Sequence, residues 1–125
     1  MSAPYAHSPG RWKTVLKQDG KAEMSWTPTP DMANPFGSVH GGIIATVIDE
    51  TAGAAVVSSI EAGSAPTVTM NVEYLHAIPI GATYTAVGEI VRMGRAMVIA
   101  DARIVNTEGE LLVRGTCIYQ IPRPK

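Results

Sequence analysis

The 125-residue sequence has few charged residues, a single cysteine and no long hydrophobic run free of acids. Charged side chains make up 17% of it, below the roughly 25% of an average soluble domain. Ten basic and eleven acidic residues give a net charge of −1, which lacks the basic excess that nucleic acid or anionic membranes select. Cys117 alone cannot form an intrachain disulfide, and the three histidines have no metal-ligand spacing. We therefore expect no nucleic-acid partner, no membrane association and no metal site.

The length predicts a single domain over residues 1–125, with a flexible N-terminal segment at residues 1–9. The first eleven residues have neither a basic region nor an apolar core, so we predict no secretory signal and a cytoplasmic location. Hydrophobic residues make up 46% of a chain whose surface-to-volume ratio is high. We expect another copy of the chain to cover part of that apolar surface in a homo-oligomer.

The first half of the sequence predicts two strands, a loop and one long helix. An Asp-Gly pair between residues 12–17 and 21–26 indicates a hairpin. Three prolines and a glycine over residues 28–37 predict an irregular loop. Residues 42–59 contain no proline and are apolar on nearly every face, which is typical of a helix enclosed by other structure. Two adjacent acids at its middle exclude a membrane span.

The remaining sequence has the period of β-strands. Residues 67–74 alternate apolar and polar side chains, and further strands are predicted at 83–91, 96–105 and 111–121. We interpret these as a meander of about four strands after the helix. The prediction is an α+β hotdog fold, in which a curved antiparallel sheet of five to six strands wraps around one long central helix.

The candidate site lies where the loop enters the helix. Taken singly, its residues have structural explanations, since Asn34 could form an Asx-turn, His40 a turn and Asp49 a satisfied buried acid. Taken together, Gly41 and Gly42 would expose backbone N–H groups at the positive end of a helix dipole, as in an oxyanion site. Asp49 would be a poorly solvated, reactive carboxylate among apolar neighbours.

If the Gly41 N–H and the Asp49 carboxylate serve one site, helix geometry places them in different subunits. Asp49 follows Gly41 by eight residues, so their Cα atoms lie about 12 Å apart on one helix. An oxyanion donor and an attacking oxygen must meet at one reacting carbon, each within about 3 Å of it. If both serve one site, that site lies across a twofold dimer interface.

The pattern Asn34-x5-His40-Gly41-Gly42-x6-Asp49, followed by Thr67-Val68-x-Met70-Asn71-Val72, resembles the hotdog-fold acyl-CoA thioesterases of the phenylacetate-degradation (PaaI-like) type. The resemblance implies hydrolysis of an acyl- or aryl-acyl-CoA to a free acid and coenzyme A, dimers that commonly pair into tetramers, and no cofactor, because coenzyme A is part of the substrate. The resemblance also implies a role for five residues. Asp49 would be the nucleophile or the general base, and the Gly41 N–H would polarise the thioester carbonyl. Asn34 would bind that carbonyl or orient the site, His40 would organise the helix start, and Thr67 would position the water or the acid.

Further residues are candidates for substrate binding. Gly42 lies beside the oxyanion donor, and Phe36 could line an acyl tunnel together with Met70 and Tyr74. Arg92 and Arg95 could bind coenzyme A phosphates or form an exposed basic turn. Three other residues have no expected catalytic role: Glu50 is expected to be structural or interfacial, Cys117 a small core residue, and His76 matches no role.

Two other functions are compatible with the sequence. A hotdog hydratase or dehydratase would use a histidine and an acid as a proton-transfer pair, although His40 directly before two glycines fits helix entry better. A non-catalytic acyl-CoA-binding module would bind the thioester without turnover. Release of free thiol from acyl-CoA distinguishes the hydrolase from both.

Overall fold

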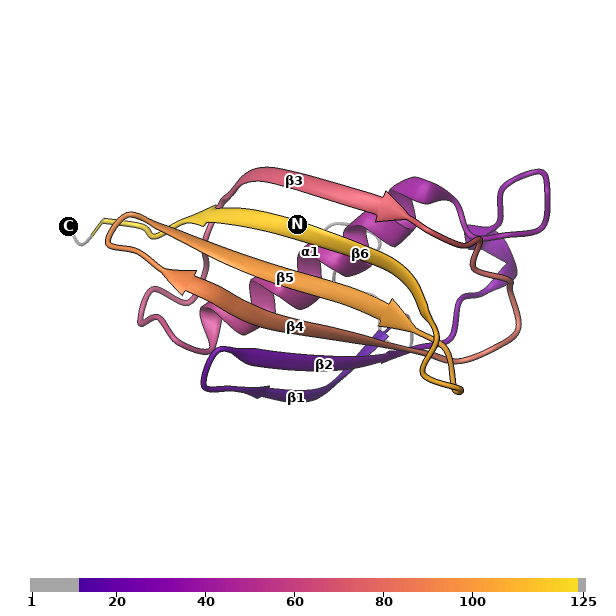
Figure 1. Ribbon diagram of the computed structural model, residues 1–125, viewed down its shortest axis with the longest axis horizontal. Coiled ribbons are helices and arrows are strands. Elements are labelled where there is room, and N and C mark those ends of the chain that lie inside the picture. Colours follow the sequence, from indigo (N-terminus) through magenta and orange to yellow (C-terminus); the bar gives the residue numbers. More distant parts are fainter. Residues whose placement is uncertain (1–11, 124–125) are drawn as a thin grey trace.

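The computed structural model describes residues 12–123, which form a six-stranded sheet and one long helix (Figure 1). The predicted flexible segment 1–9 lies outside these residues. In chain order the elements are β1 (Trp12–Gln18), β2 (Lys21–Trp26), the 3-10 turn η1 (Pro30–Met32), α1 (Gly41–Val57), β3 (Thr67–Tyr74), β4 (Tyr84–Met93), β5 (Met97–Val105) and β6 (Leu111–Gln120).

All neighbouring strands are antiparallel, and their order across the sheet is β1-β2-β4-β5-β6-β3. The sheet curves around α1, which crosses its concave face (Figure 1), so the predicted hotdog fold is confirmed. The predicted four-strand meander is wrong, because only β4, β5 and β6 follow one another as neighbours. After the helix the chain enters the sheet at its far edge as β3 and then crosses to the middle. β3 therefore has one strand neighbour within the described chain.

Local signals place the hairpin and the helix. Asp19 and Gly20 both have positive φ, 51° and 78°, which is the type I′ geometry that joins β1 to β2. The expectation that residues 28–37 hold no regular structure is wrong at η1, where a proline occupies the start of a single 3-10 turn. The helix covers Gly41–Val57 rather than the predicted 42–59, because His40 caps it one residue earlier.

Small residues let the helix lie close to the sheet. Ala22, Gly88, Ala102 and Gly115 are successive partners in one row across β2, β4, β5 and β6. A Cβ atom added at Gly88 would lie 2.5 Å from the Thr51 carbonyl oxygen of α1, and one at Gly115 would lie 2.6 Å from Ile48. Larger side chains in this row would push α1 away from the sheet.

One face of the helix stays partly open in the single chain, whereas the sequence predicted a helix enclosed by other structure. The buried face is apolar and consists of Ile43, Ile44, Val47, Ile48, Thr51, Ala52, Ala55 and Val56. Asp49, Glu50 and the small residue Gly53 lie on the other face and are only half-buried. The sheet curls around one side of α1 and leaves the side that carries the two acids accessible.

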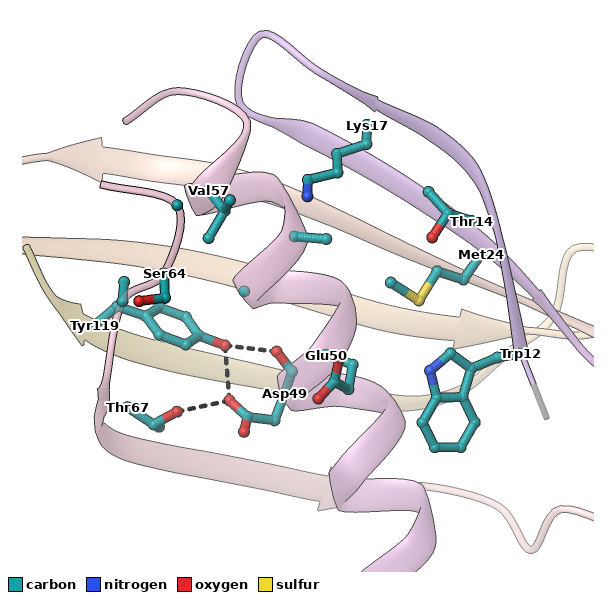
Figure 2. A pocket seen from close by; sticks show the side chains of 14 residues that line it. Trp12, Thr14, Lys17, Met24, Asp49, Glu50, Val57, Ser64, Thr67 and Tyr119 are labelled. Atoms are coloured by element: carbon teal, nitrogen blue, oxygen red, sulfur yellow. Dashed lines mark hydrogen bonds between the residues drawn. The ribbon is translucent and has the colours of Figure 1, made fainter. Parts of the chain in front are cut away.

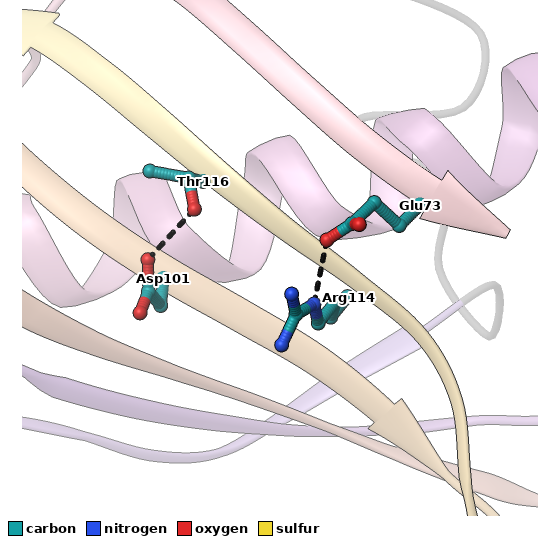
Figure 3. A network of polar contacts seen from close by, with 4 residues as sticks. All are labelled: Glu73, Asp101, Arg114 and Thr116. Atoms are coloured by element: carbon teal, nitrogen blue, oxygen red, sulfur yellow. Dashed lines mark hydrogen bonds and ion pairs between the residues drawn. The ribbon is translucent and has the colours of Figure 1, made fainter. Parts of the chain in front are cut away.

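The outer face of the sheet is polar. Arg114 donates to Glu73 at 2.6 Å, and the Thr116 hydroxyl donates to Asp101 at 3.1 Å (Figure 3). These residues point away from α1, and each of them is exposed. An antiparallel sheet commonly keeps one face on the core and one in water. Within residues 12–123, no helix is long and apolar enough to cross a membrane.

Candidate active site

A pocket of about 590 Å³ lies along the open face of α1 (Figure 2). Its walls come from β1, β2, α1, the segment before β3, and the paired ends of β3 and β6. The lining residues are Trp12, Thr14, Lys17, Met24, Asp49, Glu50, Gly53, Ala54, Val57, Gly63, Ser64, Ala65, Thr67 and Tyr119. The pocket therefore combines apolar walls with a carboxylate at which side chains from three elements meet.

Asp49 has one carboxylate oxygen occupied and one open. The Thr67 hydroxyl donates to Oδ1 at 2.9 Å, and the Tyr119 hydroxyl donates to the same oxygen at 2.9 Å (Figure 2). Oδ2 has no hydrogen-bond donor in the part of the chain that the structure describes. Asp49 is half-buried in the single chain, because it lies on the open face of α1.

A β-bulge brings Thr67 to this carboxylate. Thr67 pairs with Tyr119 and Thr69 pairs with Ile118, so Val68 is an extra residue in β3. Cross-strand partners share a face of the sheet, which puts Thr67 on the helix side together with Tyr119. Regular alternation would have placed Thr67 on the outer face with Thr69. The bulge thus turns the threonine hydroxyl toward α1.

The helix N-terminus carries the second polar feature. His40 is the N-cap residue, and its Nδ1 accepts the Gly42 N–H at 3.0 Å. That hydrogen bond requires a neutral imidazole at Nδ1. The Gly41 N–H has no acceptor among residues 12–123, so one of the two predicted donors is free and the other is occupied. A second pocket of about 370 Å³ adjoins this end and is lined by Asp31, Met32, Ala33, His40, Gly42, Ile43 and Thr46.

Strand β3 contacts both features. At its N-terminal end the Thr67 hydroxyl binds Asp49, and at its C-terminal end the Tyr74 hydroxyl donates to the Gly41 carbonyl oxygen at 2.8 Å. The two ends of one edge strand therefore mark the carboxylate and the free N–H group. Gly41 begins α1 and Asp49 lies at its middle. Asp49 lines the large pocket, whereas Gly41 lines neither pocket, although its neighbours His40 and Gly42 line the small one.

The other predicted site residues lie outside both pockets. Asn34 forms an Asx-turn, since its Oδ1 accepts the N–H groups of Phe36 and Ser38 at 2.9 and 3.2 Å. Phe36 is 91% exposed on this loop. Arg92 is the second-last residue of β4, Arg95 lies between β4 and β5, and both are exposed. The substrate-binding roles predicted for Phe36 and the two arginines stay predictions.

Sequence reasoning missed Tyr119, which comes 70 residues after Asp49. Its inward position follows from the alternation of buried and exposed residues along β6, but nothing local indicates its partner. Burial raises the pKa of the Tyr119 hydroxyl, so this group stays protonated and able to donate. Burial likewise raises the pKa of the neighbouring Cys117 thiol to about 11. Trp12 and Lys17 were also missed as pocket residues.

The described residues contain no group of three or more His, Cys, Asp or Glu side chains placed to hold a metal ion. The chemistry available at the pocket is that of a carboxylate with one open oxygen. At the helix N-terminus it is that of a free N–H group at the positive end of the dipole.

Comparison with known proteins gives a consistent set of similarities. The pattern of the thioesterase superfamily matches residues 36–113. Mouse acyl-coenzyme A thioesterase 13 is 28% identical over 83 residues, which are 66% of this chain and 59% of the mouse protein, so the match covers less than two thirds of that relative.

Two solved structures share the fold over most of their length. The E. coli PaaI protein from the phenylacetic acid degradation operon has a TM-score of 0.80 at 22% identity, covering 88% of this chain and 82% of PaaI. A Streptococcus mutans protein solved with bound acetyl CoA has a TM-score of 0.85 at 22% identity, covering 95% of each chain.

Proposed function

Because this chain belongs to the thioesterase superfamily, we propose that it is an acyl-CoA thioesterase that hydrolyses an acyl- or aryl-acyl-CoA to a free acid and coenzyme A. The resemblance inferred from the sequence is confirmed at the level of the superfamily, and PaaI is among the solved structures that share the fold. The observation that carries the proposal is the arrangement on β3, whose two ends bind the Asp49 carboxylate and the residue with the free N–H group.

Asp49 is the reactive group of this proposal. As a general base, its Oδ2 takes a proton from water while the water oxygen attacks the thioester carbon. As a nucleophile, Oδ2 attacks the carbon itself and forms an anhydride that water then hydrolyses. In both routes the carbonyl oxygen becomes an oxyanion, the C–S bond breaks and the coenzyme A thiolate leaves. The open oxygen beside the pocket supports either route.

The Gly41 N–H is the proposed oxyanion donor. It has no acceptor within residues 12–123 and lies at the positive end of α1, where a developing negative charge is stabilised most. His40 keeps the neighbouring N–H of Gly42 occupied and caps the helix at the same time. His40 Nδ1 is committed to this bond, which favours hydrolysis over a hydratase mechanism that needs a free histidine base.

A dimer is required to bring these groups together. Gly41 and Asp49 lie about 12 Å apart along α1, too far for one carbonyl group to contact both. β3 is an edge strand with one neighbour in the described chain, and it carries exposed apolar side chains: Val68 is 46%, Met70 39% and Tyr74 51% exposed. Long apolar edge strands of this kind call for a covering partner.

Pairing two copies of β3 around a twofold axis would complete the site. A twofold axis makes the strands antiparallel, so the Thr67 end of one strand lies beside the partner subunit's Tyr74. The Asp49 carboxylate of one subunit then faces Gly41 of the partner subunit. One acyl thioester could then contact both groups. The dimer, its pairing into a tetramer and the cytoplasmic location stay predictions.

The apolar part of the large pocket is the proposed acyl site. Trp12, Met24, Ala54 and Val57 line it beside the carboxylate, within a volume of about 590 Å³. An acyl chain or aromatic ring placed there would leave its carbonyl carbon next to Asp49 Oδ2. Coenzyme A belongs to the substrate, and the proposal requires no further cofactor.

The test is thiol release from a panel of short, long and aromatic acyl-CoAs. Asp49→Asn is expected to lower kcat/KM by about 100-fold or more, because a general base contributes that much. Asp101→Asn is the matched control, since Asp101 also accepts a threonine hydroxyl but lies on the outer face of the sheet. Parent-like turnover by Asp49→Asn would refute the proposal. Tight acyl-CoA binding without turnover by the parent protein would favour a binding module instead.

A further inference from the structure

Tyr119 lies under the turn of α1 that carries Asp49. Its side chain is buried on the inner face of β6. The ring passes beside Gly53, where an added Cβ would lie 3.6 Å from it, in ordinary contact. From there the hydroxyl reaches the Asp49 carbonyl oxygen at 2.8 Å and Oδ1 at 2.9 Å (Figure 2). One phenol therefore contacts both the backbone and the side chain of the same acid.

Two hydroxyl groups hold the same carboxylate oxygen. Thr67 approaches Oδ1 from β3 and Tyr119 approaches it from β6, each at 2.9 Å. Since Tyr119 also binds the Asp49 carbonyl, the side chain is fixed relative to the helix backbone. A carboxylate with one oxygen held by two donors presents its other oxygen in a defined direction.

We propose that Tyr119 is a positioning residue for Asp49, holding Oδ1 together with Thr67 so that Oδ2 is the oxygen that reacts. This inference rests on the proposed function and adds to it the choice of reactive oxygen and the residue that makes the choice. Tyr119 acts through Asp49 and has no direct role in bond making.

The surroundings of Asp49 contain few other titratable groups. Lys17 on β1 and Glu50 on α1 line the same pocket, and Cys117 on β6 interacts electrostatically with the acid. Burial keeps both the Cys117 thiol and the Tyr119 hydroxyl protonated through the neutral range, by raising the pKa of each. A change confined to the Tyr119 hydroxyl leaves Lys17 and Glu50 in place, so its effect on kcat can be assigned to the contact with Asp49.

Tyr119→Phe removes the hydroxyl and keeps the ring. We expect kcat to fall about 10-fold with KM nearly unchanged, since one hydrogen bond to a charged group is lost. The ring that lines the pocket is unchanged, so the loss should appear in kcat rather than in KM. Tyr84→Phe is the matched control: Tyr84 is also buried and donates to the Pro79 carbonyl at 2.9 Å, away from Asp49. This control should keep the parent kcat and KM.

The outcomes separate this inference from the proposed function. A parent-like kcat, or a loss that appears in KM rather than in kcat, in a folded Tyr119→Phe protein overturns the positioning role. If that variant does not fold, Thr67→Val and Thr67→Ser decide, because Thr67 is exposed and binds the same oxygen. Thr67→Val should lower kcat, whereas Thr67→Ser keeps the hydroxyl and should restore it, and no difference between them overturns the inference. Turnover by Asp49→Asn would instead overturn the proposed function itself.

Discussion

Replacing Gly41 by proline removes the proposed oxyanion donor at a position that accepts proline. Gly41 is the first residue of α1, where proline is favoured because that N–H has no helical partner. His40 has φ −59° and ψ 134°, the extended conformation that a residue before proline requires. A Cβ atom at Gly41 would lie 3.6 Å from the Tyr74 ring, in ordinary contact. The substitution therefore deletes one N–H group with little strain.

The expected effect of Gly41→Pro is a large loss of turnover with little loss of stability. Removing one oxyanion donor costs about 2.7–4 kcal/mol, which lowers kcat by about 10²–10³-fold. No intrachain hydrogen bond is lost, and proline restricts the unfolded chain, so the free energy of unfolding should change by less than about 1 kcal/mol. Gly41→Ala is the matched control, because it adds the same Cβ and keeps the N–H. It should retain most of the parent kcat in the thiol-release assay.

Mixing Gly41→Pro with Asp49→Asn tests whether two subunits share the site. After subunit exchange, half of the dimers are mixed, and each mixed dimer has one intact composite site. Recovery should approach about one quarter of the parent activity. Full activity in Gly41→Pro alone, or equal losses in Gly41→Pro and Gly41→Ala, would refute the oxyanion argument. No recovery despite confirmed exchange would refute the shared site.

Two further substitutions test the packing and the interface. Gly88→Ala should destabilise the protein by about 1–3 kcal/mol in urea unfolding, because its Cβ would lie 2.5 Å from the Thr51 carbonyl oxygen. Gly53→Ala is the control: its Cβ meets only ordinary contacts, so it should be neutral or stabilising by up to about 1 kcal/mol. Equal stability of the two variants would contradict the close approach of helix and sheet. Met70→Glu places a charge near the middle of the exposed strand β3 and should prevent two copies from pairing. Light scattering should then show a monomer, which should have unchanged helix content and no thioesterase activity. An active monomer would contradict the composite site.

Local signals in the sequence were sufficient for much of the fold. The Asp19-Gly20 pair specifies a turn with two positive φ angles, and the structure forms that turn. The apolar stretch after His40 predicts the helix to within two residues at its ends. The separation of Gly41 and Asp49 along the helix also follows from the sequence, because the rise per residue of an α-helix is fixed. These features depend on neighbours in the chain, which the sequence displays directly.

Other features depend on contacts between distant segments. Alternation along residues 67–74 predicts a half-buried strand, but β3 is an exposed edge whose bulge at Val68 turns Thr67 toward the helix. Asn34 is the residue type expected at the family's site, but in this chain its Oδ1 accepts hydrogen bonds from the N–H groups of Phe36 and Ser38 in its own loop. The row of small residues under the helix appears only when strand register aligns Gly88 with Gly115 through β5.

The sequence by itself determined the start of the helix to within one residue, the acid that the helix carries, and that this acid cannot share a reacting carbon with Gly41 of its own chain. Those conclusions follow from turn chemistry, capping and helix rise, which act over a few residues. Only the tertiary structure decided which oxygen of Asp49 is free, because Thr67 and Tyr119 reach it from strands far along the chain. It also decided that β3 is the edge strand that binds both Asp49 and Gly41, since strand order depends on how the sheet closes around the helix.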